Sequence, residues 1–350
     1  MYTREILPSI ATPIMDGKPI IGTWDKAFDK VDLMEIRKPF RNPLLNWVKY
    51  NRIKEWQCFS AHDENHLLEV LFCNYKHYKK VQLMLYDKKN KKKQIFRKLL
   101  PGSGWQLPQS LINSTTDGFS SNFLFRIHNW LDADIVTLSI NIQAIRRQPS
   151  LTVHLEYNVN YLEVTPMVVS LGFSEQRTMY AFKAHAPVHG EIIYDRKKIS
   201  LKQDTCSGFF CDYKGFYPYR MYTTTCYAMG FDTSSGKRFG FHIAENQAKE
   251  TNKNNENALW LDGELTPLPP VLITMPYGLE SIWVIQDIEG MIDLTFTPKE
   301  QNTYGTNLLF SEANSYSPMG LYNGMLVTSS GEKIIIKNLF GIGEKLFLRV

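Results

Sequence analysis

Alternation of apolar and polar residues is the feature that most constrains how this chain can fold. Between Leu151 and Val159, every odd-numbered residue is apolar or aromatic and every even-numbered residue is polar. Side chains of a strand point alternately to its two faces, so this period of two predicts a strand with one buried face. The same pattern places His154 on the exposed face. No long stretch has the spacing typical of an amphipathic helix, and we therefore predict an all-β protein with few helices.

Short strand-like segments follow one another along most of the chain, and turn residues separate them. The recurring turns are Asp262–Gly263, Glu289–Gly290, Asn323–Gly324 and Ser330–Gly331, at the spacing of a meander or barrel. A chain of 350 residues is long enough for two domains. We predict two antiparallel barrels or β-sandwiches in tandem, with an N-terminal β-domain at residues 1–175 and a C-terminal β-domain at residues 176–350.

A few segments interrupt the strand pattern. Thr178–Ala184 and Gly190–Tyr194 are predicted as separate strands, because Pro187 lies between them. Residues 40–43 predict a turn, and Leu44–Tyr50 predicts a short helical turn.

The positive charge of the chain is modest and concentrated. The net charge is +5, and much of the excess comes from the segment Lys88–Lys93. A nucleic-acid-binding protein more often spreads lysine and arginine along one element, so we expect no nucleic-acid partner. The lysine-rich segment joins two predicted strands and is typical of a solvated hairpin tip that resists edge-to-edge aggregation. A weak contact with an anionic membrane is the alternative.

Missing motifs exclude several kinds of site. The chain has no glycine-rich phosphate loop after a strand, no Gly-x-Ser-x-Gly motif and no His-Glu-x-x-His motif. Its five cysteines form no Cys-x-x-Cys pair and no zinc-binding spacing. We therefore expect no cofactor and no metal, and reduced thiols in a cytoplasmic protein. We also expect no signal peptide and no membrane-spanning segment.

Lys183 and His185 form the first candidate site. They are separated by one residue within a predicted strand, so both side chains lie on one face, about 6–7 Å apart along the chain. Such a pair suits general acid–base catalysis or contact with an anion. A solvated strand edge is the alternative.

The segment from Asp212 to Arg220 is the second candidate. It combines an acid, a guanidinium and several aromatic residues with a glycine and a proline, which predicts a loop. Aromatic residues beside an ionisable pair fit the rim of a pocket for a largely apolar ligand, with Asp212 as a candidate acid and Tyr219 and Arg220 as ligand-binding residues. An aromatic plug that closes the end of a barrel is the alternative.

His242, close to Glu245, is the third candidate. Phe239, Phe241 and Ile243 would face one side of a strand, which leaves the imidazole on the other side beside two small residues. Those small neighbours leave room for a ligand. A histidine with a structural role is the alternative.

Glu256, Asn257 and Trp260 come just before the Asp262–Gly263 turn. Asp-Gly between apolar residues predicts a hairpin, because both turn positions need positive φ. Glu256 and Asn257 then lie at the mouth of a strand that carries Trp260. We predict that Asp212 and Glu256 converge at one end of the C-terminal β-domain and line one cavity. The alternative is that Asn257 only holds the loop backbone.

The order of these segments resembles a bacterial family known as domain of unknown function 2804. The resemblance spans nearly the whole chain and rests on an ordered set of short segments. These are Gly22–Trp24, Lys54–Trp56, Lys183 with Pro187–Gly190, Asp212–Gly215 with Pro218–Tyr219, Gly240–His242, Glu256–Gly263, Ile292–Pro298 and Gly341–Glu344. By analogy of fold, the resemblance implies similarity to two-domain lipocalin-like proteins of the carotenoid hydratase and tocopherol cyclase types. Those proteins act on apolar isoprenoids without nucleotide cofactors.

One segment departs from the family pattern. Where the family carries tryptophans beside an alanine, this chain has Thr225-Cys226-Tyr227-Ala228. If the tryptophans line a pocket, the size or identity of the ligand differs here, and Tyr227 is a candidate ligand-binding residue.

Three functions fit these patterns. The first is binding of a hydrophobic small molecule or lipid in a β-barrel cavity. The second is a cofactor-free hydratase, cyclase or isomerase that acts on an apolar, isoprenoid-like substrate, with Asp212, Glu256 or the pair Lys183 and His185 as acid–base groups. The third is a structural or partner-binding protein without a ligand. Two perturbed carboxylates in one cavity would favour the enzyme.

Overall fold

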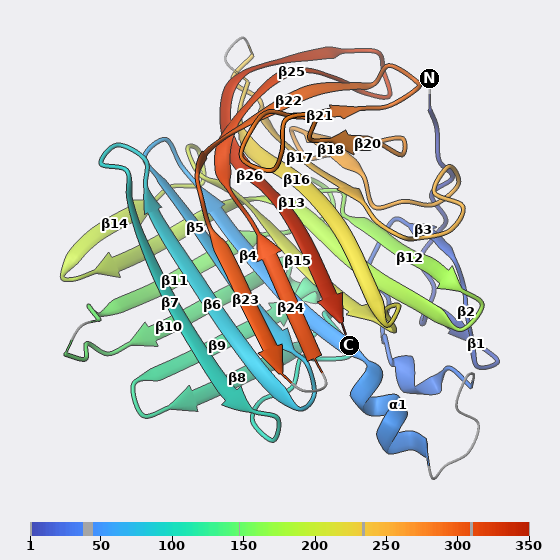
Figure 1. The fold of residues 1–350 in the computed structure, drawn as a ribbon, viewed down its shortest axis with the longest axis horizontal. Coiled ribbons are helices and arrows are strands. Elements are labelled where there is room, and N and C mark those ends of the chain that lie inside the picture. Colours follow the sequence, from blue (N-terminus) through green and yellow to red (C-terminus); the bar gives the residue numbers. More distant parts are fainter. Residues whose placement is uncertain (1, 38–44, 147, 233–234, 309–310, 350) are drawn as a thin grey trace.

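Two large antiparallel sheets make up most of the molecule (Figure 1). The computed structural model describes residues 2–37, 45–146, 148–232, 235–308 and 311–349. Within these ranges the helices are α1 (Asn46–Arg52) and the 3₁₀ helices η1 (Leu33–Glu35) and η3 (Leu131–Ala133). None of them is long and apolar enough to cross a membrane. The predicted all-β class is confirmed, whereas the turn predicted at residues 40–43 lies outside the described residues.

The first sheet has 13 strands and runs in the order β7-β6-β5-β4-β15-β13-β11-β10-β9-β8, with β12, β14 and β3 attached at its side. Its strands are β3 (Gly22–Trp24), β4 (Lys54–His62), β5 (His66–Asn74), β6 (Tyr78–Asp87), β7 (Lys92–Pro101), β8 (Ser114–Ser120), β9 (Phe123–Trp130), β10 (Ile135–Ile142), β11 (Leu151–Asn158), β12 (Met167–Ser174), β13 (Arg177–Tyr194), β14 (Lys197–Leu201) and β15 (Ser207–Gly215). Before it, β1 (Ile14–Met15) and β2 (Lys18–Pro19) form a small separate hairpin.

The second sheet has 11 strands and runs in the order β19-β18-β17-β16-β26-β25-β22-β21-β20, with β24 on β26 and β23 on β24. Its strands are β16 (Arg220–Phe231), β17 (Arg238–Glu245), β18 (Ala258–Leu261), β19 (Glu264–Pro267), β20 (Leu272–Thr274), β21 (Trp283–Gln286), β22 (Ile292–Glu300), β23 (Thr303–Leu308), β24 (Ser311–Tyr316), β25 (Met319–Val327) and β26 (Lys333–Arg349).

Each sheet curls into a half-barrel, and the two half-barrels follow one another along the chain as predicted (Figure 1). One buried apolar cluster forms the core of the first half-barrel, and another forms the core of the second. A third cluster lies where the sheets face one another, and it contains residues of both, such as Phe209 and Trp260. Strand pairing changes from the first sheet to the second between Gly215 and Arg220, later than the boundary predicted at residue 175. The division into two folding units stays a prediction.

The prediction of two strands around Pro187 is wrong, because β13 is a single strand of 18 residues. On one side β12 pairs with β13 only up to Lys183, and β11 pairs only from Val188 onward. Pro187 lies in the gap between these two partners, where a backbone N–H is not needed for the ladder. The missing donor therefore does not interrupt the strand.

The lysine-rich segment is the turn between β6 and β7, as predicted. Lys88 does not fit the interpretation of a solvated tip, because its ammonium donates a hydrogen bond to the carbonyl of Asp63. Burial lowers the pKa of Lys88 to about 8. The membrane contact proposed for this turn stays a prediction.

The Asp262–Gly263 hairpin between β18 and β19 is confirmed. Asp262 has φ 50° and Gly263 has φ 88°, the left-handed region that the Asp-Gly pair predicts. A Cβ on Gly263 would lie 1.7 Å from the carbonyl oxygen of Glu163. The hairpin is thus pressed against the first half of the chain.

Replacing Gly263 by alanine should destabilise the fold far more than the same change at Gly290. Gly290 also has positive φ, at 75°, but a Cβ there would meet no atom within 4 Å. We expect Gly290→Ala to cost about 1 kcal/mol through backbone strain alone, and Gly263→Ala to cost about 3 kcal/mol or more. Urea unfolding of the two variants measures the difference. Equal losses would show that the contact with Glu163 relaxes easily.

Candidate functional site

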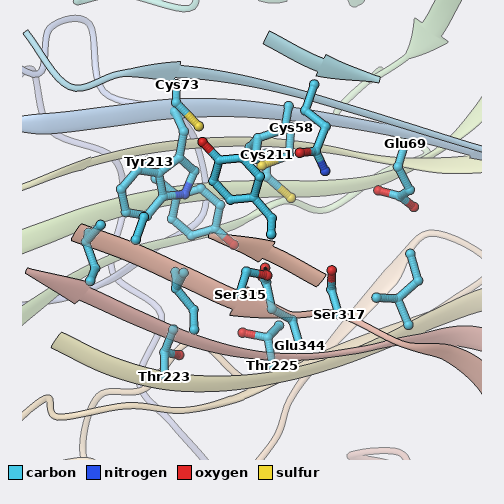
Figure 2. Close-up of a pocket in the computed structure, with 18 of the residues that line it drawn as sticks. Cys58, Glu69, Cys73, Cys211, Tyr213, Thr223, Thr225, Ser315, Ser317 and Glu344 are labelled. Carbon is cyan, nitrogen blue, oxygen red and sulfur yellow. Dashed lines mark hydrogen bonds between the residues drawn. The ribbon is translucent and has the colours of Figure 1, made fainter. Parts of the chain in front are cut away.

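A cavity of about 210 Å³ lies between the two half-barrels. Strands β4, β5, β6 and β15 provide one wall, and β16, β24 and β26 provide the other (Figure 2). Side chains alternate along each strand, so every second residue of these strands reaches the cavity and the residues between them point to the opposite face. The two sheets face one another here, and their side chains leave the space between them partly empty.

The wall from the first sheet is aromatic and rich in sulfur. Trp56 stacks on Tyr217 with ring centroids 5.0 Å apart. Cys58, Cys73 and Cys211 line the same wall as free thiols. Burial raises the pKa of Cys73 to about 11 and that of Cys211 to about 12, so these thiols are neutral at physiological pH. This wall favours an apolar or aromatic ligand.

The wall from the second sheet is lined with hydroxyl groups. Thr223 and Thr225 of β16 lie on the same wall as Ser315 of β24 and Ser317 just after it (Figure 2). Ser315 donates a hydrogen bond of 2.6 Å to Oε1 of Glu344 on β26. An apolar ligand with a polar edge would fit between the two walls.

Glu69 on β5 lies in the cavity, within the otherwise apolar run Leu67–Cys73. The hydroxyl of Tyr227 donates to its Oε2 at 3.1 Å, while Oε1 is buried without a hydrogen-bond partner among the described residues. Burial raises the pKa of Glu69 to about 8, and the negative charge of Glu344 adds to this effect. The carboxyl therefore holds its proton at neutral pH and can exchange it near the pH at which cells operate.

Glu344 places a second carboxyl group in the same cavity. Burial raises its pKa, whereas the hydrogen bond from Ser315 and the positive charge of Lys80 lower it. Glu69 and Glu344 come from opposite walls (Figure 2). A ligand between the walls would thus have a carboxyl group on each side.

Lys183, His242 and Glu256 form a charged cluster at the edge of the cavity. The ammonium of Lys183 lies 2.8 Å from Oε2 of Glu256, 3.0 Å from the carbonyl oxygen of Glu256 and 2.9 Å from Nδ1 of His242. Lys183 is completely buried, and its carboxylate partner is nearly so. Burial, together with the charge of Lys183, holds the pKa of His242 well below its usual range, so the imidazole is neutral.

The hydrogen bonds of His242 orient a tyrosine hydroxyl. Because the ammonium of Lys183 donates to Nδ1, the ring proton lies on Nε2. Nε2 is 3.4 Å from the hydroxyl oxygen of Tyr213, which therefore accepts from the imidazole. Tyr213 lines the cavity and keeps its own proton to donate.

Asp212 does not line this cavity, and its predicted convergence there with Glu256 is wrong. The predicted loop begins only after Gly215, and Asp212 lies in the middle of β15. Its neighbours Cys211 and Tyr213 face the cavity, so its own side chain points to the opposite face, where it pairs with Lys214.

The structure places Lys183 and His185 on the same face of β13, as predicted. Both are completely buried, so the solvated strand edge is excluded. His185 packs against Gly240 and lies 5.1 Å from Phe209 between ring centroids. It is absent from the cavity lining, and neither ring nitrogen has a hydrogen-bond partner among the described residues.

Asn257 and Trp260 are buried in the structure and lie outside the cavity lining. The side chain of Asn257 accepts a hydrogen bond from the backbone N–H of Ala244 and donates one to the carbonyl of Pro269. These bonds agree with the alternative that Asn257 only holds the loop backbone. The indole of Trp260 donates to the carbonyl of Thr165. These contacts join the second half-barrel to the loops around it.

The remaining predicted ligand-binding residues divide into two groups. Tyr219 and Arg220 are exposed and lie outside the cavity lining, whereas Tyr227 and His242 line it. In the segment that departs from the family pattern, Thr225 and Tyr227 face the cavity. Cys226, between them, packs into the core of the second half-barrel.

Glu69, Glu344 and Lys80 are cavity residues that the sequence patterns did not reveal. One signal for Glu69 was available, because it is a single carboxylate inside the apolar run Leu67–Cys73. Burying a charged side chain in a strand that is covered on both faces costs free energy, so such a residue indicates a specific role. Glu344 lies in one of the segments that carry the family resemblance, but its position in a cavity follows only from the pairing of β26 with β16 and β24.

Comparison with known proteins agrees with this architecture. The family model described as "Domain of unknown function (DUF2804)" matches residues 15–349. The chain belongs to the DUF2804 family. No curated protein matches the sequence.

Among solved structures, this DUF2804 protein is similar to kievitone hydratase from Nectria haematococca. The TM-score is 0.50 at 11% sequence identity, and the alignment covers 85% of this chain and 88% of the hydratase. At this identity the similarity establishes a shared fold of two tandem half-barrels. Within the described residues, no group of three or more His, Cys, Asp or Glu side chains could hold a metal ion.

Proposed function

We propose that the protein is a cofactor-free enzyme that binds an apolar small molecule between its half-barrels and moves protons on it. The observation that carries this proposal is the presence of two carboxyl groups with raised pKa, Glu69 and Glu344, in one aromatic-lined cavity. Buried carboxyl groups whose pKa lies near the working pH are the usual groups for general acid–base catalysis.

A hydratase or isomerase is the reaction class that fits this arrangement. In a hydration, a protonated carboxyl gives its proton to one carbon of a double bond, and water adds to the other carbon. The opposite carboxylate takes the proton that the water loses, so charge and atoms balance. The neighbouring fold is that of a hydratase, which agrees with this class although the low identity supports the fold alone.

The cavity limits the size of the ligand. An engineered apolar cavity of about 150 Å³ holds benzene, so a space of this size suits a molecule somewhat larger than one aromatic ring. The neutral thiols and stacked aromatic rings would contact its apolar part, and the hydroxyl groups of β16 and β24 would contact its polar edge.

A passive carrier of the same ligand is the second candidate, because the apolar wall alone suffices for binding. Both candidates need the cavity, and a variant that fills it tests them together. Replacing Thr225 by tryptophan should abolish both the retention of copurified ligand and any turnover. The change Tyr222→Trp, on the same strand but at an exposed position, should leave both intact.

Native mass spectrometry with extraction of bound compounds measures retention in each variant. A folded Thr225→Trp protein that retains ligand as the unsubstituted chain does would contradict a site in this cavity. Ligand retention without turnover in the unsubstituted chain would favour the carrier.

A further inference from the structure

Lys80 on β6 is the only lysine that lines the cavity in the part of the chain that the structure describes. The residue is 6% exposed. Its ammonium lies 3.1 Å from the centroid of the Tyr304 ring, and the guanidinium of Arg97 lies 5.3 Å from the same centroid. No carboxylate among the described residues lies within ion-pair distance of Lys80. The side chain is therefore held by an aromatic face beside a second cation.

This environment increases the fraction of Lys80 that is present as the neutral amine. Burial lowers the pKa of Lys80 to about 8, and the charge of Arg97 acts in the same direction, while Cys73 and Glu344 oppose the shift. Lysines that act as nucleophiles are activated in this way, by desolvation or by a neighbouring cation. At pH 7 roughly one tenth of such an amine is neutral, compared with less than about 0.1% of an ordinary lysine.

We propose that Lys80 forms an imine with the carbonyl group of an apolar aldehyde or ketone bound in the cavity. The proposal names the chemical class of the ligand and rests on the proposed function only in requiring that the cavity binds an apolar molecule. It does not require proton transfer by Glu69. An anionic ligand held by Lys80 as an ion pair is disfavoured, because three glutamates, Glu69, Glu256 and Glu344, line the cavity.

The reaction needs only groups that the cavity contains. The neutral amine of Lys80 attacks the carbonyl carbon, so a C–N bond forms and the carbonyl π bond breaks. The nitrogen loses one proton and the carbonyl oxygen gains one. The resulting carbinolamine loses its hydroxyl group as water with one more proton, which leaves a protonated imine. Glu344 lies close enough to Lys80 for the two charges to affect each other's pKa, and its carboxyl group is suited to supply and recover these protons.

Reductive trapping tests the proposal. The protein is incubated at pH 7 with cinnamaldehyde and sodium cyanoborohydride, which reduces a protonated imine to a stable secondary amine. We expect one adduct per chain, mapped to Lys80 by peptide mass spectrometry, at a rate roughly 100-fold above that of exposed lysines such as Lys197. The variant Lys80→Arg keeps a cation over Tyr304 but cannot form the imine, and it should lose the adduct.

Trapping in two further variants distinguishes imine formation at Lys80 from the proposed acid–base catalysis. In Glu69→Gln the trapping at Lys80 should persist even where turnover is lost, because the imine does not depend on that carboxyl group. In Thr225→Trp the trapping should be lost, because the cavity is filled. Labelling spread evenly over exposed lysines, or the same labelling in Lys80→Arg, would overturn the proposal while leaving acid–base catalysis by Glu69 intact.

Discussion

Replacing Glu69 by glutamine should make the protein more stable at alkaline pH while removing its activity. The folded state holds the proton of Glu69 up to about pH 8, whereas the unfolded chain releases it near the ordinary glutamate value of 4.5. Between these two values the folded state binds more protons, so stability falls as pH rises through this window. Because the cavity gives the side chain partial contact with water, we expect a loss on the order of 2–4 kcal/mol between pH 5 and pH 8.

Glutamine resembles the protonated carboxyl group and cannot lose a proton, so Glu69→Gln should lack most of this dependence. Its activity should fall at least about 100-fold, because general acid–base groups contribute roughly that much or more. Any turnover by the unsubstituted protein should decline above about pH 8 if Glu69 acts as the acid. Urea unfolding and turnover as a function of pH measure these effects.

Glu64, exposed in the turn just before β5, provides the matched control. Glu64→Gln should change neither the pH dependence of stability nor the activity. A Glu69→Gln protein that keeps the pH dependence of the unsubstituted chain would show that Glu69 is ionised in the fold. Loss of the pH dependence with activity retained would remove Glu69 from the mechanism but not from the cavity.

The sequence predicted the class of the fold well because the evidence for it is local. Strand alternation around Leu151 and positive φ at Asp262 and Gly263 depend on a few neighbouring residues. The interruption at Pro187 was predicted wrongly, because the tolerance of a proline depends on which strands pair beside it. That information lies in β11 and β12, which pair with different halves of β13.

The site was predicted only in part, for a related reason. Lys183 and Glu256 were both recognised as candidates, but nothing in their spacing shows that they form an ion pair between β13 and the loop before β18. Whether a residue faces a cavity depends on one step of register: Cys211 and Tyr213 reach it and Asp212 does not. The candidate carboxyl groups were chosen from segments predicted as loops, whereas Glu69 and Glu344 lie within strands.

Removing the charge of Lys183 should destabilise the fold strongly, because it leaves a buried carboxylate without its partner. The ammonium is completely buried and contacts the carboxylate and the carbonyl of Glu256 and the ring of His242. Breaking one side of a buried ion pair typically costs 3–5 kcal/mol, and we expect a loss of about that size in Lys183→Met. Urea unfolding at pH 7 measures the change in free energy of unfolding.

The same long strand supplies the control. Glu191 of β13 pairs with Lys198 of β14 at the surface, where the lysine side chain is 59% exposed. Lys198→Met should therefore cost less than about 1 kcal/mol, because water screens exposed pairs.

The double variant Lys183→Met with Glu256→Gln should regain part of the lost stability, since no unpaired carboxylate remains buried. If Lys183→Met loses no more than Lys198→Met, the cluster does not join the two half-barrels. If the double variant is less stable than Lys183→Met, Glu256 stabilises the fold through other partners, of which the amide of Asn246, 2.6 Å from its Oε1, is the first candidate.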